Sequence, residues 1–304
     1  MDKRMGEGRI MGEGEDGMDK RIGERITALL LESDALRIAP EDRPFWYTSA
    51  TIGPFYNNTQ FLFGGEARAN ELLALIDDAA AAKTGRLGAQ GAISARILAE
   101  YGEGGLFRKA ADCMAEYMRA RIDMDGIDII SGGERRDWIF SIIAAHLFRK
   151  PHLAIFKDMS AALGGAPVAP GSLAGKRCLH VSDLVTEASS YTRAWAPAVA
   201  AAGARLTDSL TVVDRAQGGG AALAALGIRH HALVSMTPEL FDRLLSEGRI
   251  NGRQRELIRR YMQDPRGAMR AFVMAHPEFV ESALRSGGKD AERARECVAK
   301  GIYA

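Results

Sequence analysis

The chain has 304 residues, 47% hydrophobic and 26% charged, enough to bury a sizeable core in one or two domains. Its 40 Lys and Arg nearly balance its 39 Asp and Glu, and a net charge of +1 provides no overall attraction to nucleic acid or anionic membrane. No stretch approaches the ~18 apolar residues of a membrane span, and the first residues lack the apolar core of a signal peptide, so we expect a cytoplasmic protein without nucleic-acid or membrane partners.

The N-terminal third divides into segments of different character. Residues 1–17 are rich in charge and glycine and poor in apolar side chains, which predicts a disordered leader. From Ile26 the apolar residues recur with a helical period. Residues 47–65 combine aromatic residues with glycine and proline, as in irregular strands or loops, and residues 66–123 are predicted to be mainly helical.

The centre of the chain alternates between short apolar runs and helical patterns. Such alternation predicts an α/β fold with a mainly parallel sheet, here of five strands. Residues 159–176 are rich in Gly, Pro, Ala and Ser without any period, so we expect a functional or mobile loop there. The predicted strands cover residues 127–131, 153–157, 177–182, 209–214 and 230–235, and the predicted helices cover residues 137–149, 189–202 and 220–226.

The pattern becomes purely helical after Thr237-Pro238, a pair typical of a helix start. We therefore divide the chain into an α/β domain at 18–236 and a helical C-terminal extension at 237–304. Packing is the simplest role for this extension.

The loop after the predicted strand 177–182 carries the clearest chemical signal. Ligands of open α/β sheets bind beyond the carboxyl ends of the strands, and here Asp183 stands at a strand tip before a run of small residues, 186–190. Small residues at a helix start let backbone N–H groups approach a phosphate, and a nearby carboxylate suits ribose hydroxyls or a metal ion. The same residues would also form an ordinary turn and a serine helix cap, so both interpretations stay open.

This segment resembles the type I phosphoribosyltransferases, and among them the orotate phosphoribosyltransferases. In that family two acids and a Thr-Thr-Gly-Gly-Ser-like loop hold the ribose and 5′-phosphate of phosphoribosyl pyrophosphate; Ser182-Asp183 and residues 186–190 occupy those places. Residues 213–219 resemble the family's Val-Asp-Arg segment, and residues 53–57 its early proline-aromatic segment. Residues 130–136 stand where the family has its pyrophosphate loop.

The resemblance spans residues 26 to 236 in order and implies a type I phosphoribosyltransferase fold with an N-terminal hood. It implies a homodimer and a Mg²⁺-dependent transfer of phosphoribosyl from phosphoribosyl pyrophosphate to orotate or another carboxylated base. Asp183 and Lys157 would be catalytic, with Asp183 also holding the metal. The implied binding residues are Thr186, Ser189 and Ser190 for the 5′-phosphate, Arg135 and Arg136 for pyrophosphate, Phe55 and Tyr56 for the base ring, and Arg215 for its carboxylate.

Several departures from the family pattern raise an alternative. Ser182 replaces the first acid, Ala188 and Ser189 replace the two glycines, and Glu187 brings a carboxylate toward the expected phosphate. The segment after Lys157-Asp158 lacks the cations that would stabilise a departing pyrophosphate. The alternatives are therefore a non-catalytic regulatory protein that binds a nucleobase or nucleotide, or an enzyme of different chemistry on the same scaffold.

Overall fold

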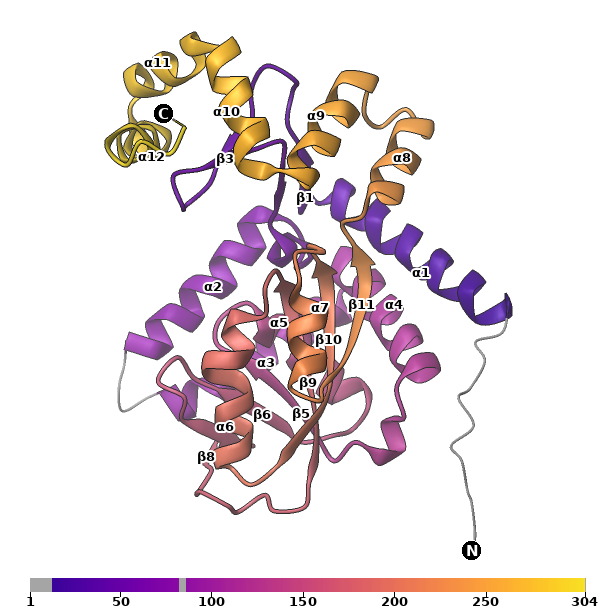
Figure 1. Cartoon of the computed structure of the whole chain (residues 1–304). Helices are drawn as coiled ribbons and strands as arrows, with labels where there is room; N and C mark the ends of the chain where they lie inside the picture. Colours follow the sequence, from indigo (N-terminus) through magenta and orange to yellow (C-terminus); the bar gives the residue numbers. More distant parts are fainter. Residues whose placement is uncertain (1–12, 82–85, 304) are drawn as a thin grey trace, which may run out of the picture.

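The apolar runs in the centre of the chain form one seven-stranded sheet with strand order β11-β10-β9-β5-β6-β7-β8. The computed structural model describes residues 13–81 and 86–303 (Figure 1). Neighbouring strands from β11 to β6 are parallel, which confirms the predicted α/β class. The strands are β5 (Ile129–Gly133), β6 (His152–Ile155), β7 (Ala161–Leu163), β8 (Ala166–Pro167), β9 (Arg177–Val185), β10 (Arg205–Asp214) and β11 (Arg229–Ser235).

The last two strands of this sheet differ from our expectation. β7 and β8 lie within the segment 159–176 that we expected to be a loop, and they extend the five parallel strands by an antiparallel hairpin. Gly164 and Gly165, both with positive φ, make the tight turn between them. The hairpin gives no β-branched signal because its strands consist mainly of alanine.

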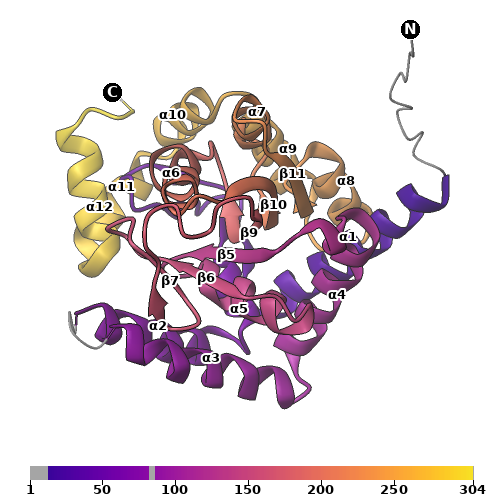
Figure 2. The same ribbon diagram turned by 90° about the horizontal axis from the view of Figure 1, so that it is seen from below.

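Helices cover both faces of the sheet (Figures 1 and 2). The helix α5 packs on β5 and β9 with α3 and α4 against it, while α6 and α7 lie on the opposite face with β10 and β11. The helices of this part are α1 (Glu13–Glu32), α2 (Glu66–Ala81), α3 (Arg86–Gly102), α4 (Leu106–Arg121), α5 (Asp137–Leu147), α6 (Ala196–Ala201) and α7 (Gly219–Ala225). Short helical turns are η1 (Thr59–Leu62), η2 (Met124–Gly126) and the π-type η3 (Tyr191–Trp195). None of the described helices is both long and apolar enough to span a membrane.

The N-terminal region differs from our expectation at one place. We predicted a disordered leader at residues 1–17. Residues 1–12 lie outside the described residues, and residues 13–17 form the beginning of helix α1. Residues 36–57 then form a hood of two small antiparallel pairs, β1 with β4 and β2 with β3. The irregular strands or loops predicted for residues 47–65 include β3 and β4, whereas β1 and β2 precede that range and the helical turn η1 lies within it. The hood strands are β1 (Leu36–Ile38), β2 (Phe45–Trp46), β3 (Ile52–Gly53) and β4 (Phe55–Asn57).

The C-terminal extension is helical, as predicted, and packs on the hood (Figure 1). The ring of Phe241 lies 5.2 Å from that of Phe55, between ring centroids, and Trp46 stacks on Phe279 at 5.5 Å. The backbone N–H of Ile52 donates to the Tyr303 hydroxyl at 2.9 Å. The helices are α8 (Pro238–Ser246), α9 (Gly252–Gln263), α10 (Pro265–Ala275), α11 (Pro277–Ser286) and α12 (Gly288–Ala299).

We expect Phe241→Ala to destabilise the fold, because the Phe241 ring is fully buried between the extension and the hood. Removing such a ring costs about 3–5 kcal/mol of unfolding free energy, measurable by urea denaturation. Met274→Ala in α10 is the control, since Met274 is 72% exposed and should change stability by less than about 0.5 kcal/mol. Equal effects of the two substitutions would show that the extension does not stabilise the hood.

Candidate functional site

Two adjoining cavities lie at the carboxyl end of the sheet. The first, of about 300 Å³, is lined by residues 134–137 after β5, by the end of β9 and by residues 186–190. The second, of about 230 Å³, lies between the hood and the ends of β9 and β10. Arg136 and Leu184 line both cavities, so a ligand could extend from one into the other. The second cavity is lined by Tyr47, Thr48, Ser49, Phe55, Tyr56, Asn57, Arg136, Leu184 and Arg215.

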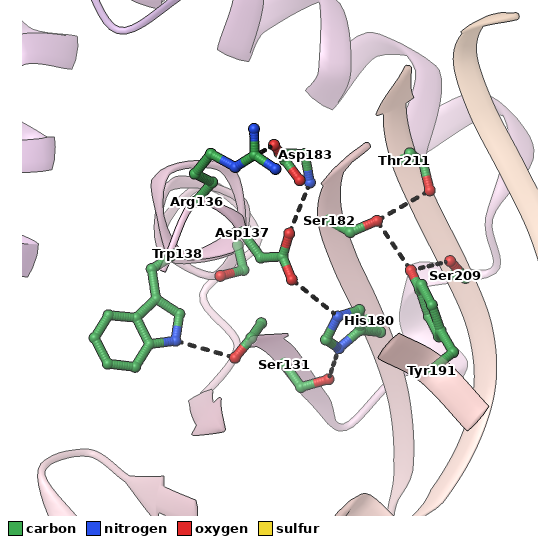
Figure 3. A network of polar contacts seen from close by, with 12 residues as sticks. Ser131, Arg136, Asp137, Trp138, His180, Ser182, Asp183, Tyr191, Ser209 and Thr211 are labelled. Atoms are coloured by element: carbon green, nitrogen blue, oxygen red, sulfur yellow. Dashed lines mark hydrogen bonds and ion pairs between the residues drawn. The ribbon is translucent and has the colours of Figure 1, made fainter. Parts of the chain in front are cut away.

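Asp183, the expected ribose-binding acid, lies in the first cavity and is tightly held (Figure 3). Its Oδ2 accepts from the Thr59 hydroxyl at 2.9 Å and lies 3.1 Å from Arg136 Nε. Its backbone N–H donates to Asp137 Oδ1 at 3.0 Å. Burial raises the pKa of Asp183 to about 6, Arg136 opposes that rise and the neighbouring Asp137 adds to it.

A buried polar chain supports this arrangement from below (Figure 3). Asp137 Oδ2 lies 3.6 Å from Nε2 of His180, whose Nδ1 is 2.9 Å from the Ser131 hydroxyl. The Cys178 thiol in turn donates to Ser131 at 3.2 Å. The contacts of Asp137 tie the start of α5 to the tip of β9 and so fix the base of the first cavity.

Ser182, which replaces the family's first acid, belongs to a second buried network (Figure 3). Its hydroxyl lies 3.0 Å from both the Tyr191 hydroxyl and the Thr211 hydroxyl, and Tyr191 is 2.6 Å from the Ser209 hydroxyl. Burial raises the pKa of Tyr191. An ionised carboxylate at 182 would have to be buried among these hydroxyls, so serine is the residue that this network accommodates.

The loop 186–190, the expected phosphate loop, lines the first cavity. Ala188 is buried and has φ +56°, a left-handed conformation that glycine adopts more easily. Thr186, Ser189 and Ser190, the residues that the resemblance assigns to the 5′-phosphate, line the first cavity, and so does the exposed Glu187. Arg193, which the sequence did not single out, donates to the Ser189 backbone oxygen at 3.2 Å and to its hydroxyl at 3.3 Å.

The expected pyrophosphate cations are not all directed to the cavity. Arg136 lines it but is paired with Asp183, and Arg135 lines it while its guanidinium lies 2.5 Å from Asp77 of α2. Lys157 is not among the residues that line either cavity; its Nζ is 3.9 Å from the Glu134 carboxylate. Arg136 is therefore the one expected cation that borders both cavities.

In the second cavity, Arg215 lies beside aromatic side chains. Its guanidinium is 5.9 Å from the centre of the Tyr47 ring, which lies 5.6 Å from the ring of Tyr56. Tyr47 donates to the backbone oxygen of Phe55, and burial raises the pKa of its hydroxyl. Phe55 also lines the cavity, but its ring is buried against the C-terminal helices, so Tyr56 and Tyr47 are the rings better placed to face a base.

The resemblance assigns the implied Mg²⁺ to Asp183, which lines the first cavity. Within residues 13–81 and 86–303, no group of three or more His, Cys, Asp or Glu side chains could hold a metal ion. A single carboxylate nevertheless fits Mg²⁺, which often takes most of its ligands from water and substrate phosphates. Asp183 is the residue that would hold it.

Comparison with known proteins confirms the resemblance suggested by the sequence. No protein-family model matches the chain. It is 34% identical over 103 residues to uridine 5′-monophosphate synthase of Bos taurus, a match that covers 34% of this chain and 20% of that protein. It is 30% identical over 88 residues to orotate phosphoribosyltransferase of Saccharolobus solfataricus, covering 29% of this chain and 44% of that protein.

The structure resembles that of Leishmania donovani UMP synthase with a TM-score of 0.54 and 16% sequence identity. That match covers 83% of this chain and 44% of the other, so the similarity spans less than half the length of each of these three proteins. The chain thus has the expected type I phosphoribosyltransferase fold, and its sequence resembles the orotate phosphoribosyltransferases.

We expect the stability difference between Asp183→Asn and wild type to depend on pH. The pKa of about 6 in the folded protein exceeds the ordinary value, so the wild-type carboxyl favours folding when protonated and loses that advantage as pH rises toward 6. The melting temperature of the variant, measured relative to that of wild type, should therefore rise as the pH is raised from 4.5 to 7.5.

Asp128→Asn is the control of opposite sign, because hydrogen bonds from Arg177 and Lys176 lower the pKa of Asp128. That variant should lose stability relative to wild type only as pH rises through the acid range below about pH 5, and the difference should stay constant between pH 5 and 7.5. A pH-independent difference for Asp183→Asn would contradict the raised pKa.

We expect Ala188→Gly to stabilise the protein by about 0.5–1 kcal/mol, because glycine adopts the left-handed conformation of residue 188 without steric strain. Ala74→Gly, at an exposed position inside α2, should instead cost about 1 kcal/mol. Urea denaturation of the two variants measures both values. Destabilisation by Ala188→Gly would mean that the loop is not held in this conformation.

Proposed function

We propose that the protein binds phosphoribosyl pyrophosphate and a carboxylated nucleobase such as orotate in the two cavities, and transfers the phosphoribosyl group to the base. The observation that carries this proposal is the pair of adjoining cavities with Arg136 and Leu184 in common. One cavity has an acid and a phosphate-type loop, and the other has an arginine beside aromatic rings. The chain's similarity to an orotate phosphoribosyltransferase supports the same assignment.

Each group has a defined task in this scheme. Asp183 accepts hydrogen bonds from the ribose hydroxyls, and the backbone and hydroxyls of residues 186–190 bind the 5′-phosphate. Arg215 donates to the carboxylate of the base, for which a guanidinium is well suited. Arg136 exchanges its partner Asp183 for the pyrophosphate, which frees the carboxylate for the ribose. Mg²⁺, when bound, would neutralise charge on the pyrophosphate.

A second candidate function is binding without turnover, and specific observations favour it. Glu187 lines the cavity where the 5′-phosphate would bind, and two unit charges ~4 Å apart repel by about 1 kcal/mol in water and about 4 kcal/mol near a protein surface. Arg135 and Lys157 are engaged by Asp77 and Glu134. Transition-state stabilisation of the leaving group is therefore weak, and we expect transfer to be slow.

Calorimetry with phosphoribosyl pyrophosphate and Mg²⁺, followed by orotate on the same preparation, tests the binding. An assay for the nucleotide product on that preparation then tests the transfer. Binding of both compounds with slow product formation would support the transferase, and binding with no product would support the regulatory alternative. If neither compound binds, the proposed function is wrong.

We expect the combined substitution Glu187→Thr, Ala188→Gly and Ser189→Gly to tighten phosphoribosyl pyrophosphate binding about five- to tenfold, because it removes a carboxylate from the phosphate loop. The readout is the Kd measured by calorimetry. Glu292→Thr, on the exposed face of α12, makes the same charge change far from the cavities and should leave the Kd unchanged. Glu187→Thr alone keeps the Ser189 hydroxyl, and unchanged affinity in both this variant and the triple variant would show that Glu187 does not face the phosphate.

A further inference from the structure

Three arginines lie together at the amino end of the sheet, opposite the end that carries the two cavities described above. Arg177, Arg205 and Arg229 are the first residues of the neighbouring parallel strands β9, β10 and β11. The arrows of these strands point toward the hood, so their first residues lie at the far end of the sheet from it (Figure 1). All three arginines line one cavity of about 530 Å³, together with Thr207 and Gly227.

The protein neutralises the guanidinium groups of these arginines to different degrees. Arg229 makes two contacts with the buried Asp208, at 2.9 and 3.1 Å, which fix its position. Arg177 lies 3.7 Å from the exposed Asp123, and such exposed ion pairs contribute little. Arg205 has no ion pair or side-chain hydrogen bond with any residue that the structure describes. The cavity therefore keeps uncompensated positive charge.

The positions of Arg177 and Arg205 are unfavourable unless an anion is present. The two residues are partners in the register of β9 and β10, so their side chains emerge on the same face of the sheet. Like charges directly opposite each other on neighbouring strands repel. An anion bound by both guanidinium groups would replace this repulsion by two attractive contacts. The pair therefore indicates a negatively charged ligand.

The residues that line the cavity define the class of this ligand. Among those described, none has an acidic, aromatic or aliphatic side chain, so a nucleobase or an apolar peptide side chain would find little surface to pack on. A guanidinium binds phosphate oxygens in a two-point geometry and carries five N–H donors. Three such groups and the Thr207 hydroxyl offer more donors than a single phosphate group can engage. The ligand should therefore carry several phosphoryl groups.

We propose that Arg177, Arg205 and Arg229 form a binding site for a small polyphosphate anion. Arg229, fixed by Asp208, forms the rigid side of the site, and the other two arginines donate to the phosphoryl oxygens. The site lies at the opposite end of β9 from Asp183, so it is separate from the cavities to which we assign the transfer. It does not rest on the proposed function, because its evidence comes from other residues and another end of the sheet.

Calorimetry with sodium tripolyphosphate on the full chain tests the site. Arg205→Gln removes a guanidinium that pairs with no described residue, so we expect it to weaken tripolyphosphate binding about fivefold or more. Arg295→Gln, on the exposed face of α12, makes the same charge change away from the cavity and should leave the Kd within about twofold. Inorganic phosphate should bind wild type more weakly than tripolyphosphate, because it reaches fewer of the guanidinium groups.

Arg136→Gln separates this site from the cavities at the other end of the sheet. Tripolyphosphate bound in the first cavity would be sensitive to Arg136, which lines that cavity. The binding that Arg205→Gln weakens should instead persist in Arg136→Gln.

Melting temperatures provide a second measurement and verify that each variant is folded. Without an anion, Arg205→Gln should melt no lower than wild type, because it removes the repulsion from Arg177. With tripolyphosphate, its melting temperature should rise less than that of wild type.

Several results would overturn the inference. It is wrong if wild type does not bind tripolyphosphate, if Arg205→Gln and Arg295→Gln change the Kd equally, or if Arg136→Gln abolishes all binding. Equal affinities for tripolyphosphate and inorganic phosphate would contradict the polyphosphate class. The proposed function stands or falls separately, because it is tested with phosphoribosyl pyrophosphate and orotate.

Discussion

The ion pair between Arg136 and Asp183 is the interaction on which the rest of the site depends. It joins the loop after β5 to the tip of β9, and Arg136 borders both cavities. Asp183 is buried, and burying an unpaired carboxylate costs a large amount of free energy. The ion pair with Arg136 and the hydrogen bond from Thr59 therefore stabilise its ionised form. A ligand that offers Arg136 a phosphate and Asp183 a hydroxyl can replace this pair without leaving either group unsatisfied.

The second cavity depends in turn on the contact between the hood and the C-terminal extension. The hood supplies Tyr47, Tyr56 and Asn57 to the second cavity, but its strands have two or three residues each and too few ladder hydrogen bonds to be stable alone. Rings of the extension pack on Phe55 and Trp46, on the side that the sheet does not cover. The second cavity thus depends on helices at the opposite end of the chain.

Local pattern was enough to predict the alternating strands and helices, the helical extension and the position of Asp183 near the carboxyl end of a strand, although β9 continues two residues beyond it to Val185. The residues that sequence reasoning missed act through contacts between distant segments. Thr59 is 124 positions from Asp183, and Asp137 reaches β9 from the start of another element. Nothing in a single sequence marks such pairs, since the signal lies in the side-chain geometry rather than in a local period. The strands β7 and β8 were not predicted for a different reason. Their alanine-rich sequences carry only a weak local signal for a strand.

The most direct test of this account is a crystal structure of the protein with the nucleotide formed by joining orotate to ribose 5-phosphate. The account predicts that the phosphate contacts residues 186–190, that the ribose hydroxyls contact Asp183 and that the base lies between Tyr56 and Arg215. Crystals grown at saturating nucleotide that show the nucleotide outside both cavities, or that show no bound nucleotide, would contradict it.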